Sequence, residues 1–172
     1  MGVRRPDGHL AQRRETVIPP EALAQRSRVV GEKNALRPEA GYALGRMMLA
    51  GLIDWRMHNA GLMLRDQRLA WGGAIGLPSF ELRQALSDAP TRPDVPEEDA
   101  RRRAVRYRNA VAAVHSAGCP AWKWVVSVVY QDRDYAFVNG IASSVGLVAL
   151  RLGLSALADH YRIPRVENEK AA

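Results

Sequence analysis

A run of arginines in the second half of the chain is the strongest candidate for chemistry. Between Ala100 and Gln131 there are six positively charged residues and no acidic ones. They are Arg101, Arg102, Arg103, Arg106, Arg108 and Lys123. The planar guanidinium of arginine donates hydrogen bonds in a fork that matches phosphate oxygens and base edges. The run therefore predicts a surface that binds a polyanion.

Helical spacing gathers most of these arginines into a ridge. Arg102, Arg106 and Asn109 follow one another at i, i+4 and i+7. Arg101 and Arg108 lie beside the predicted core stripe of this helix, which consists of Ala100, Ala104, Tyr107, Val111 and Val114. A basic ridge backed by a packed face can hold phosphates. We predict that Arg101, Arg102, Arg106 and Arg108 bind DNA phosphates.

Three acidic residues just before the run leave a second interpretation open. Glu97, Glu98 and Asp99 stand three or four positions before Arg101 and Arg102. Opposite charges at these separations attract each other on a helix. In this interpretation the arginines form a solvated, partly paired face without a ligand.

Residues that catalyse reactions or bind metals do not cluster in the sequence. No histidine has another histidine at i+3 or i+4, and the single cysteine has no recognisable activating set. They are His9, His58, His115, His160 and Cys119. The glycine-rich segment 72–76 lacks the Lys-Ser/Thr of a phosphate-binding loop. We therefore expect no enzyme activity, no metal site and no cofactor.

The spacing that follows Asp134 predicts a helix-turn-helix. Ala136, Gly140 and Ile141 match the small residue of the first helix, the glycine of the turn and the apolar residue after it. The predicted groove-facing positions of the second helix are Ser143, Ser144 and Arg151.

The second helix of this motif departs from the pattern of a DNA reader. Between Ser143 and Leu157 only Arg151 is basic, and Gly146 stands where a β-branched core residue is expected. A leucine stripe runs along the helix at Leu147, Leu150, Leu154 and Leu157. This helix is apolar enough to pack on the body of the protein or to dock a partner.

The elements that position these residues are predicted to be helices. Only 6% of the residues are aromatic, and Ala, Leu and Arg are plentiful, so we expect an all-α fold. It comprises a helical pair, a C-terminal helix-turn-helix-like unit and a mobile basic arm. The predicted ranges are a basic arm at 1–18, a helical unit at 19–76, a Pro-rich linker at 77–96, a helix-turn-helix-like unit at 97–163 and a tail at 164–172. Arg4, Arg5, Arg13 and Arg14 of the arm are further predicted phosphate contacts.

Local signals set several helix boundaries. Gly51 can end a helix in a left-handed conformation, and Asp54 can cap a helix from Trp55 to about residue 70, which the pair Gly72-Gly73 would end. The small pair Ala60-Gly61 on the inner face of that helix would allow a neighbour to approach closely. The β-branched segment 121–131 is interpreted as a helix in preference to a strand.

Charge and composition indicate the partner and the compartment. Lys and Arg number 25 against 18 Asp and Glu, which gives a formal charge of +7 and a pI near 10.2. This balance favours a nucleic-acid partner. A single cysteine, the lack of an apolar signal segment and the lack of a membrane span predict a cytoplasmic protein with no membrane partner.

Two segments resemble a poorly characterised group of small bacterial and prophage helix-turn-helix proteins with a sigma-region-4-like C-terminal hairpin. The first segment holds Tyr42, Gly51-Leu52-Ile53, His58-Asn59-Ala60-Gly61 and Leu64-Arg65. The second is the tail Leu154-Ser155-Ala156-Leu157-Ala158-Asp159-His160-Tyr161. The resemblance covers roughly 37–72 and 105–162 and implies DNA association in a regulatory or phage context.

These observations predict a protein that binds double-stranded DNA, with transcriptional regulation of bacterial or prophage genes as the leading function. One alternative is a phage DNA-packaging component similar to a small terminase subunit, which would act as an oligomer. The other is a helical interaction module without DNA binding, whose residues Leu147, Leu150 and Leu154 dock a protein partner or a second copy of the chain.

Overall fold

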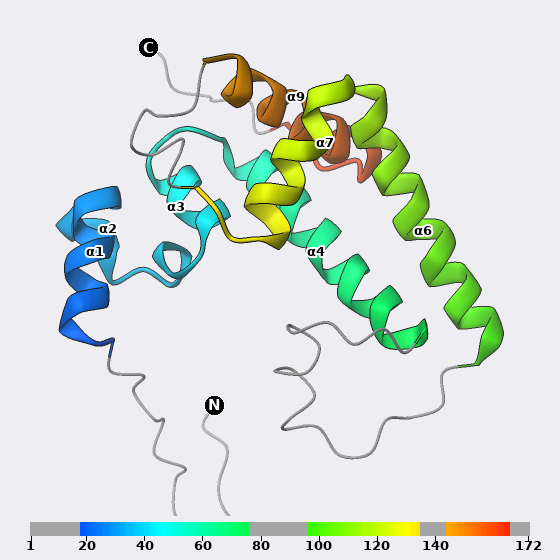
Figure 1. Ribbon diagram of the computed structural model, residues 1–172, viewed down its shortest axis with the longest axis horizontal. Helices are drawn as coiled ribbons and strands as arrows, with labels where there is room; N and C mark the ends of the chain where they lie inside the picture. The colour runs from blue at the N-terminus through cyan, green and yellow to red at the C-terminus, as the bar shows by residue number, and fades with distance from the viewer. Residues whose placement is uncertain (1–17, 76–95, 135–143, 166–172) are drawn as a thin grey trace, which may run out of the picture.

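The structure is a computed structural model that describes residues 18–75, 96–134 and 144–165, and these residues confirm the all-α expectation (Figure 1). They form helices and connecting turns and contain no strand. The elements are α1 (Pro20–Val30), α2 (Glu32–Ala35), the 3₁₀ helix η1 (Pro38–Gly41), α3 (Ala43–Leu49), α4 (Trp55–Ile75), α6 (Glu97–Ser116), α7 (Cys119–Val125), the π-helical turn η2 (Val126–Tyr130) and α9 (Ser144–His160).

Helix α9 is the centre of the packing. It lies against α4, α6 and α7, and Leu150, Leu154 and Leu157 are fully buried there. Each fully buried leucine contributes roughly 1.5–3 kcal/mol. The leucine stripe predicted from the sequence therefore forms the middle of the core.

Both long parts of the chain contribute to one hydrophobic cluster. Leu44 and Leu64 come from the part before the proline-rich segment, and Val114 and Leu154 come from the part after it. Helices α4 and α6 also lie side by side along much of their length (Figure 1). The ranges 19–76 and 97–163 are thus packed against each other in the folded protein.

Close contacts between helices depend on residues without a large side chain. A Cβ on Gly61 of α4 would lie 2.6 Å from Leu44 Cδ2 and 3.4 Å from Leu154 Cδ2. The prediction that Ala60-Gly61 admits a close neighbour is confirmed. A Cβ on Gly146 of α9 would lie 2.9 Å from Trp124 Cζ2. The indole of Trp124 therefore occupies the space that a β-branched residue would fill at Gly146.

The helix boundaries around α4 agree with the sequence at the start and differ at the end. Gly51 has φ +70°, and the Asp54 carboxylate accepts a hydrogen bond from the Met57 amide at 2.7 Å. The prediction that Gly72-Gly73 ends this helix is wrong, because α4 continues to Ile75. A glycine inside a helix costs only about 1 kcal/mol. Packing near the end of α4, such as the stack of Trp71 on Tyr107 with ring centroids 5.0 Å apart, offsets that cost.

The segment 121–131 is helical, as predicted. It comprises most of α7 and all of η2, and Val125, Val128 and Val129 are buried. β-branched residues have a lower helix propensity, but burial against α9 and the rest of the core overrides it.

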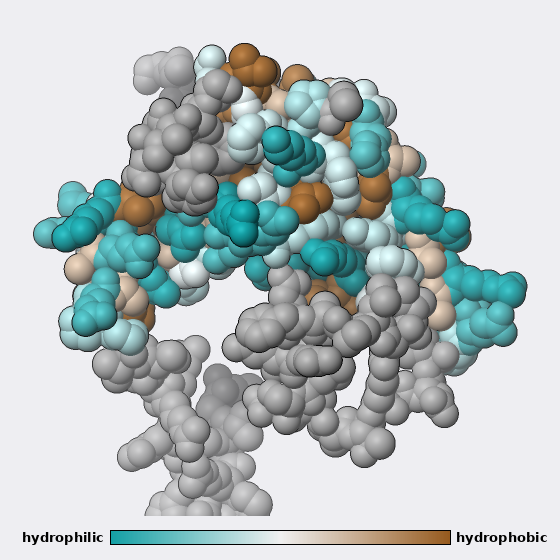
Figure 2. Space-filling view, in the orientation of Figure 1, coloured by the Kyte–Doolittle hydropathy of each residue, from teal (hydrophilic) through white to brown (hydrophobic). Residues whose placement is uncertain are grey.

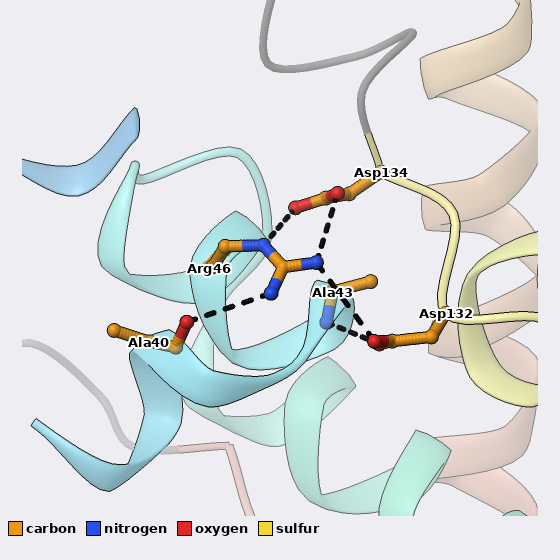
Figure 3. Close-up of polar contacts among 5 residues, drawn as sticks. All are labelled: Ala40, Ala43, Arg46, Asp132 and Asp134. Carbon is orange, nitrogen blue, oxygen red and sulfur yellow. Dashed lines mark hydrogen bonds and ion pairs between the residues drawn. The ribbon is translucent and has the colours of Figure 1, made fainter. Parts of the chain in front are cut away.

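An ion pair joins α3 to the residues that follow η2 (Figure 3). The Arg46 guanidinium donates to both carboxylate oxygens of Asp134, at 2.7 and 3.1 Å, and reaches the Asp132 carboxylate at 4.0 Å. Asp132 also accepts a hydrogen bond from the Ala43 amide. Burial lowers the pKa of Arg46, but the hydrogen bond and charge of Asp134 outweigh it and raise this pKa above its ordinary value.

Candidate nucleic-acid interface

Helix α6 carries the predicted phosphate-binding arginines between Arg101 and Arg108. The chain enters the helix after Pro96, and three acidic residues in the first turn complement the positive end of the helix dipole. Ala110 and Val114 in the second half are buried against the core. The part of α6 before that anchor carries Arg101, Arg102, Arg103, Arg106 and Arg108, which are all exposed.

This surface is hydrophilic where it can be seen. Figure 2 shows strongly hydrophilic side chains at the edge of the molecule where α6 begins, beside the lower end of α4 in the same view (Figure 1). An exposed arginine cluster of this kind can approach a flat or convex polyanion without first moving any part of the core.

Two of the predicted phosphate contacts are paired with acids in this structure. Arg101 lies 2.8 Å from the Glu97 carboxylate. Arg102 lies 3.2 Å from Glu98 and 3.4 Å from Asp99. The geometry that the second interpretation required is therefore present for these two arginines.

Arg103, Arg106 and Arg108 have no acidic partner among the described residues. Arg108 Nε donates to the Ala104 carbonyl of its own helix at 3.4 Å. Arg103 and Arg106 form neither an ion pair nor a side-chain hydrogen bond within the part of the chain that the structure describes. Because an α-helix turns by about 100° per residue, Arg102 and Arg106 share one flank and Arg101 and Arg108 share another.

Arg103 is a candidate that the sequence pattern did not select. It stands four residues before Tyr107 and seven before Ala110, so it shares the side of α6 that packs against α4. At that spacing a residue is expected to be in the core. Arg103 is nevertheless exposed, and its position along α6 alone does not predict this.

Two of the three predicted groove-facing residues lie in the described part of the chain. Ser144 is exposed at the first turn of α9. The Arg151 guanidinium donates from Nε to the Leu52 carbonyl at 2.6 Å, which ties α9 to the turn before α4. Arg151 is exposed, but one of its donors is thus engaged by the protein's own backbone.

Several predicted residues lie outside the described part of the chain. The helix-turn-helix residues Ala136, Gly140, Ile141 and Ser143 fall in 135–143, and Arg4, Arg5, Arg13 and Arg14 fall in 1–17. Asp134, where the predicted motif begins, lies outside a helix and binds Arg46.

The apolar docking surface proposed from the sequence requires a correction. Leu150 and Leu154 are fully buried, and Leu147 is partly buried against the core. A partner cannot reach the two buried leucines while the protein is folded. The apolar side chains that α9 exposes are Val145, Val148 and Leu152, with exposed fractions of 69%, 54% and 53%.

The buried side chain of His58, near the start of α4, pairs with Tyr42. His58 Nε2 lies 2.8 Å from the Tyr42 hydroxyl, and Nδ1 lies 3.2 Å from Asn59 Oδ1. Burial lowers the pKa of His58 from its ordinary value. Within the described residues, no three metal-ligating side chains lie close enough together to hold an ion, and no helix could cross a membrane.

Comparison of the chain with known protein families, with characterised proteins and with solved structures finds no match. Its function must therefore be inferred from the geometry of α6 and α9 and from the charge of the chain.

Proposed function

We propose that this chain binds double-stranded DNA through the part of α6 between Arg101 and Arg108 and acts as a regulator of bacterial or prophage genes. The observation that carries the proposal is the set of five exposed arginines within eight residues of one helix. They outnumber the three acids of the first turn, in a chain whose formal charge is +7. The regulatory role is what the sequence resemblance implies.

The contacts we propose are to phosphates. Arginines on two flanks of one exposed helix can bind the backbone of a duplex but carry no sequence information of their own. The basic side chain that α9 offers after Ser144 is Arg151, and its Nε donates a hydrogen bond to the Leu52 carbonyl. We therefore propose binding dominated by counterion release, with a strong dependence on salt.

Fluorescence anisotropy of a labelled duplex at several salt concentrations tests this proposal. The test variant is Arg101→Ala/Arg102→Ala/Arg106→Ala. We expect weaker binding and a shallower plot of log K against log salt, by about 0.9 for each phosphate that the variant no longer neutralises. A matched control, Arg28→Ala/Arg37→Ala/Arg133→Ala, removes three exposed arginines that lie away from α6. Equally weakened binding in both variants would overturn the assignment of the site to α6.

A second candidate function is supported by the exposed apolar side chains of α9. Val145, Val148 and Leu152 recur at i, i+3 and i+7 and form one exposed row. Such a row fits a protein partner or a second copy of the chain. Sedimentation of the wild type and of Val148→Asp tests self-association. A wild-type dimer that the substitution dissociates would support this function, and a ring-sized assembly would favour the packaging role.

A further inference from the structure

We infer that Glu97, Glu98 and Asp99 act as an internal competitor for DNA, so that Arg103 and Arg106 make the first phosphate contacts. In this inference Arg101 and Arg102 join only by exchanging a carboxylate for a phosphate. The inference rests on the proposed function and assigns different roles to arginines that the sequence treats alike.

The contacts within α6 separate the arginines into two classes. Arg101 and Arg102 lie within 2.8–3.4 Å of carboxylates on their own helix. Arg103 and Arg106 have no such partner among the described residues, although they stand only one to five positions away. Helical spacing alone does not produce this separation, because Arg103 stands four positions after Asp99, just as Arg101 does after Glu97. In the structure the Asp99 carboxylate lies 3.4 Å from Arg102 instead.

The paired arginines remain available to a stronger ligand. The side chains of Arg101 and Glu97 are 77% and 80% exposed, and those of Arg102 and Glu98 are 61% and 81% exposed. Ion pairs between solvated side chains are weak and are screened by salt. A DNA phosphate can therefore displace the carboxylate, but it must approach against the negative charge of the acids.

The unpaired arginines are placed to bind first. Arg106 stands four residues after Arg102 on the same flank of α6, and Arg103 lies on the side facing α4. Both are exposed, and neither requires an internal ion pair to break. A phosphate held there would lie one turn from Arg102 and could then replace Glu98 and Asp99 as its partner.

This arrangement predicts a specific salt signature. When a phosphate takes an arginine from a carboxylate, the DNA releases a condensed cation, but the freed carboxylate again attracts cations. The net release of cations is therefore smaller than at an arginine that was unpaired. The wild-type plot of log K against log salt should therefore be shallower than the number of arginines implies. Neutralising the acids should make the plot steeper as well as strengthening binding.

The test compares two triple variants with the same change in net charge. Glu97→Gln/Glu98→Gln/Asp99→Asn removes the competitor. Glu21→Gln/Glu32→Gln/Asp66→Asn is the matched control, because these acids are also exposed and two of them also occupy the first turn of a helix. Far-UV circular dichroism establishes that both variants keep the helical content of the wild type.

Anisotropy titration of a labelled duplex gives the decisive measurement. At low salt we expect the first variant to bind about five- to tenfold more tightly, roughly twofold for each charge removed. We expect its salt slope to steepen by up to about 1.8, or 0.9 for each arginine released. The control should show a smaller gain in affinity and no change in slope.

Variants of the arginines themselves test which arginines bind the first phosphates. In the wild-type background, Arg103→Ala/Arg106→Ala should lower the affinity more than Arg101→Ala/Arg102→Ala does. The two losses of affinity should become equal once the acids are neutralised. If the wild type binds but both acid variants change affinity and slope equally, the inference is overturned and the proposed function stands. If neither the wild type nor the acid-neutral variant binds at low salt, the proposed function fails and the inference with it.

Discussion

The buried side chain of His58 gives the protein a predictable response to acid. His58 is 5% exposed and shares a hydrogen bond with the Tyr42 hydroxyl. Burial lowers its pKa, and the charge of Arg65 acts in the same direction, while Asn59 and the charge of Glu39 oppose the shift. The folded protein therefore favours the neutral imidazole.

The sign of the pH dependence follows from this shift. When the pH falls below the ordinary value of 6.5, the unfolded chain takes up a proton at His58 that the folded chain resists. The stability from His58 is thus complete above pH 6.5 and decreases as the pH falls toward the lower pKa of the folded state. We expect the thermal midpoint to decrease as the pH is lowered through this range. Circular dichroism melts at successive pH values measure the decrease. His58→Gln should make the thermal midpoint less dependent on pH in this range, whereas His115→Gln, at an exposed position, should not. Equal slopes of the midpoint against pH in both variants would contradict the assignment to His58.

Arg46 is the residue whose removal should cost most in the polar part of the fold. Asp134 is 7% exposed, and Arg46→Met would leave its carboxylate buried without its ion-pair partner. We expect the free energy of unfolding to fall by about 3 kcal/mol, at the lower end for a broken buried pair. Urea unfolding measures it. The double variant Arg46→Met/Asp134→Leu should recover much of this stability, because no buried charge is then left in the site and the remaining Asp132 side chain is 59% exposed.

At the scale of the element, two glycines in helices have opposite roles. A Cβ on Gly146 would meet the Trp124 ring at 2.9 Å, whereas a Cβ on Gly72 of α4 meets nothing within 4 Å. Both substitutions to alanine gain about 1 kcal/mol of helix propensity. Only Gly146→Ala adds an overpacking cost of about 1–3 kcal/mol. The difference between the two variants in urea unfolding should therefore be about 1–3 kcal/mol, and two equally stabilised variants would show that Trp124 moves away freely.

The elements that the sequence predicts are those whose cause is local. The cap at Asp54 and the left-handed Gly51 follow from residues within a few positions, and the leucine stripe of α9 follows from a repeating pattern. The reason for Gly146 lies in Trp124, on another helix, and no spacing along α9 reveals it. The end of α4 depends in the same way on a neighbour in α6.

The candidate site shows the same division. That α6 exposes a row of arginines could be predicted from composition and period, and so could the pairing of Arg101 with Glu97, because both lie on one helix. Two contacts could not be predicted, since Arg151 reaches the Leu52 carbonyl across 99 positions and Arg46 reaches Asp134 across 88. Charge alone does not distinguish an arginine that binds a partner from one that holds the fold together.

At the scale of the whole molecule, the shared core predicts a single unfolding transition. Leu44 and Leu64 lie in the same hydrophobic cluster as Val114 and Leu154, so neither part of the chain buries its apolar surface without the other. Small domains with one core usually unfold cooperatively. Trp55 and Trp71 lie on α4, and Trp122 and Trp124 lie on α7, so tryptophan fluorescence reports on both parts, and far-UV circular dichroism reports on all helices. We expect the urea curves of Trp71→Phe, Trp122→Phe and the wild type to have coincident fluorescence and dichroism transitions within each protein.

Leu154→Ala, which removes a fully buried side chain between α4 and α7, should shift both signals together and cost about 2–5 kcal/mol. Two separated transitions in the wild type, or a Leu154→Ala shift confined to one probe, would show that the ranges 19–76 and 97–163 fold independently.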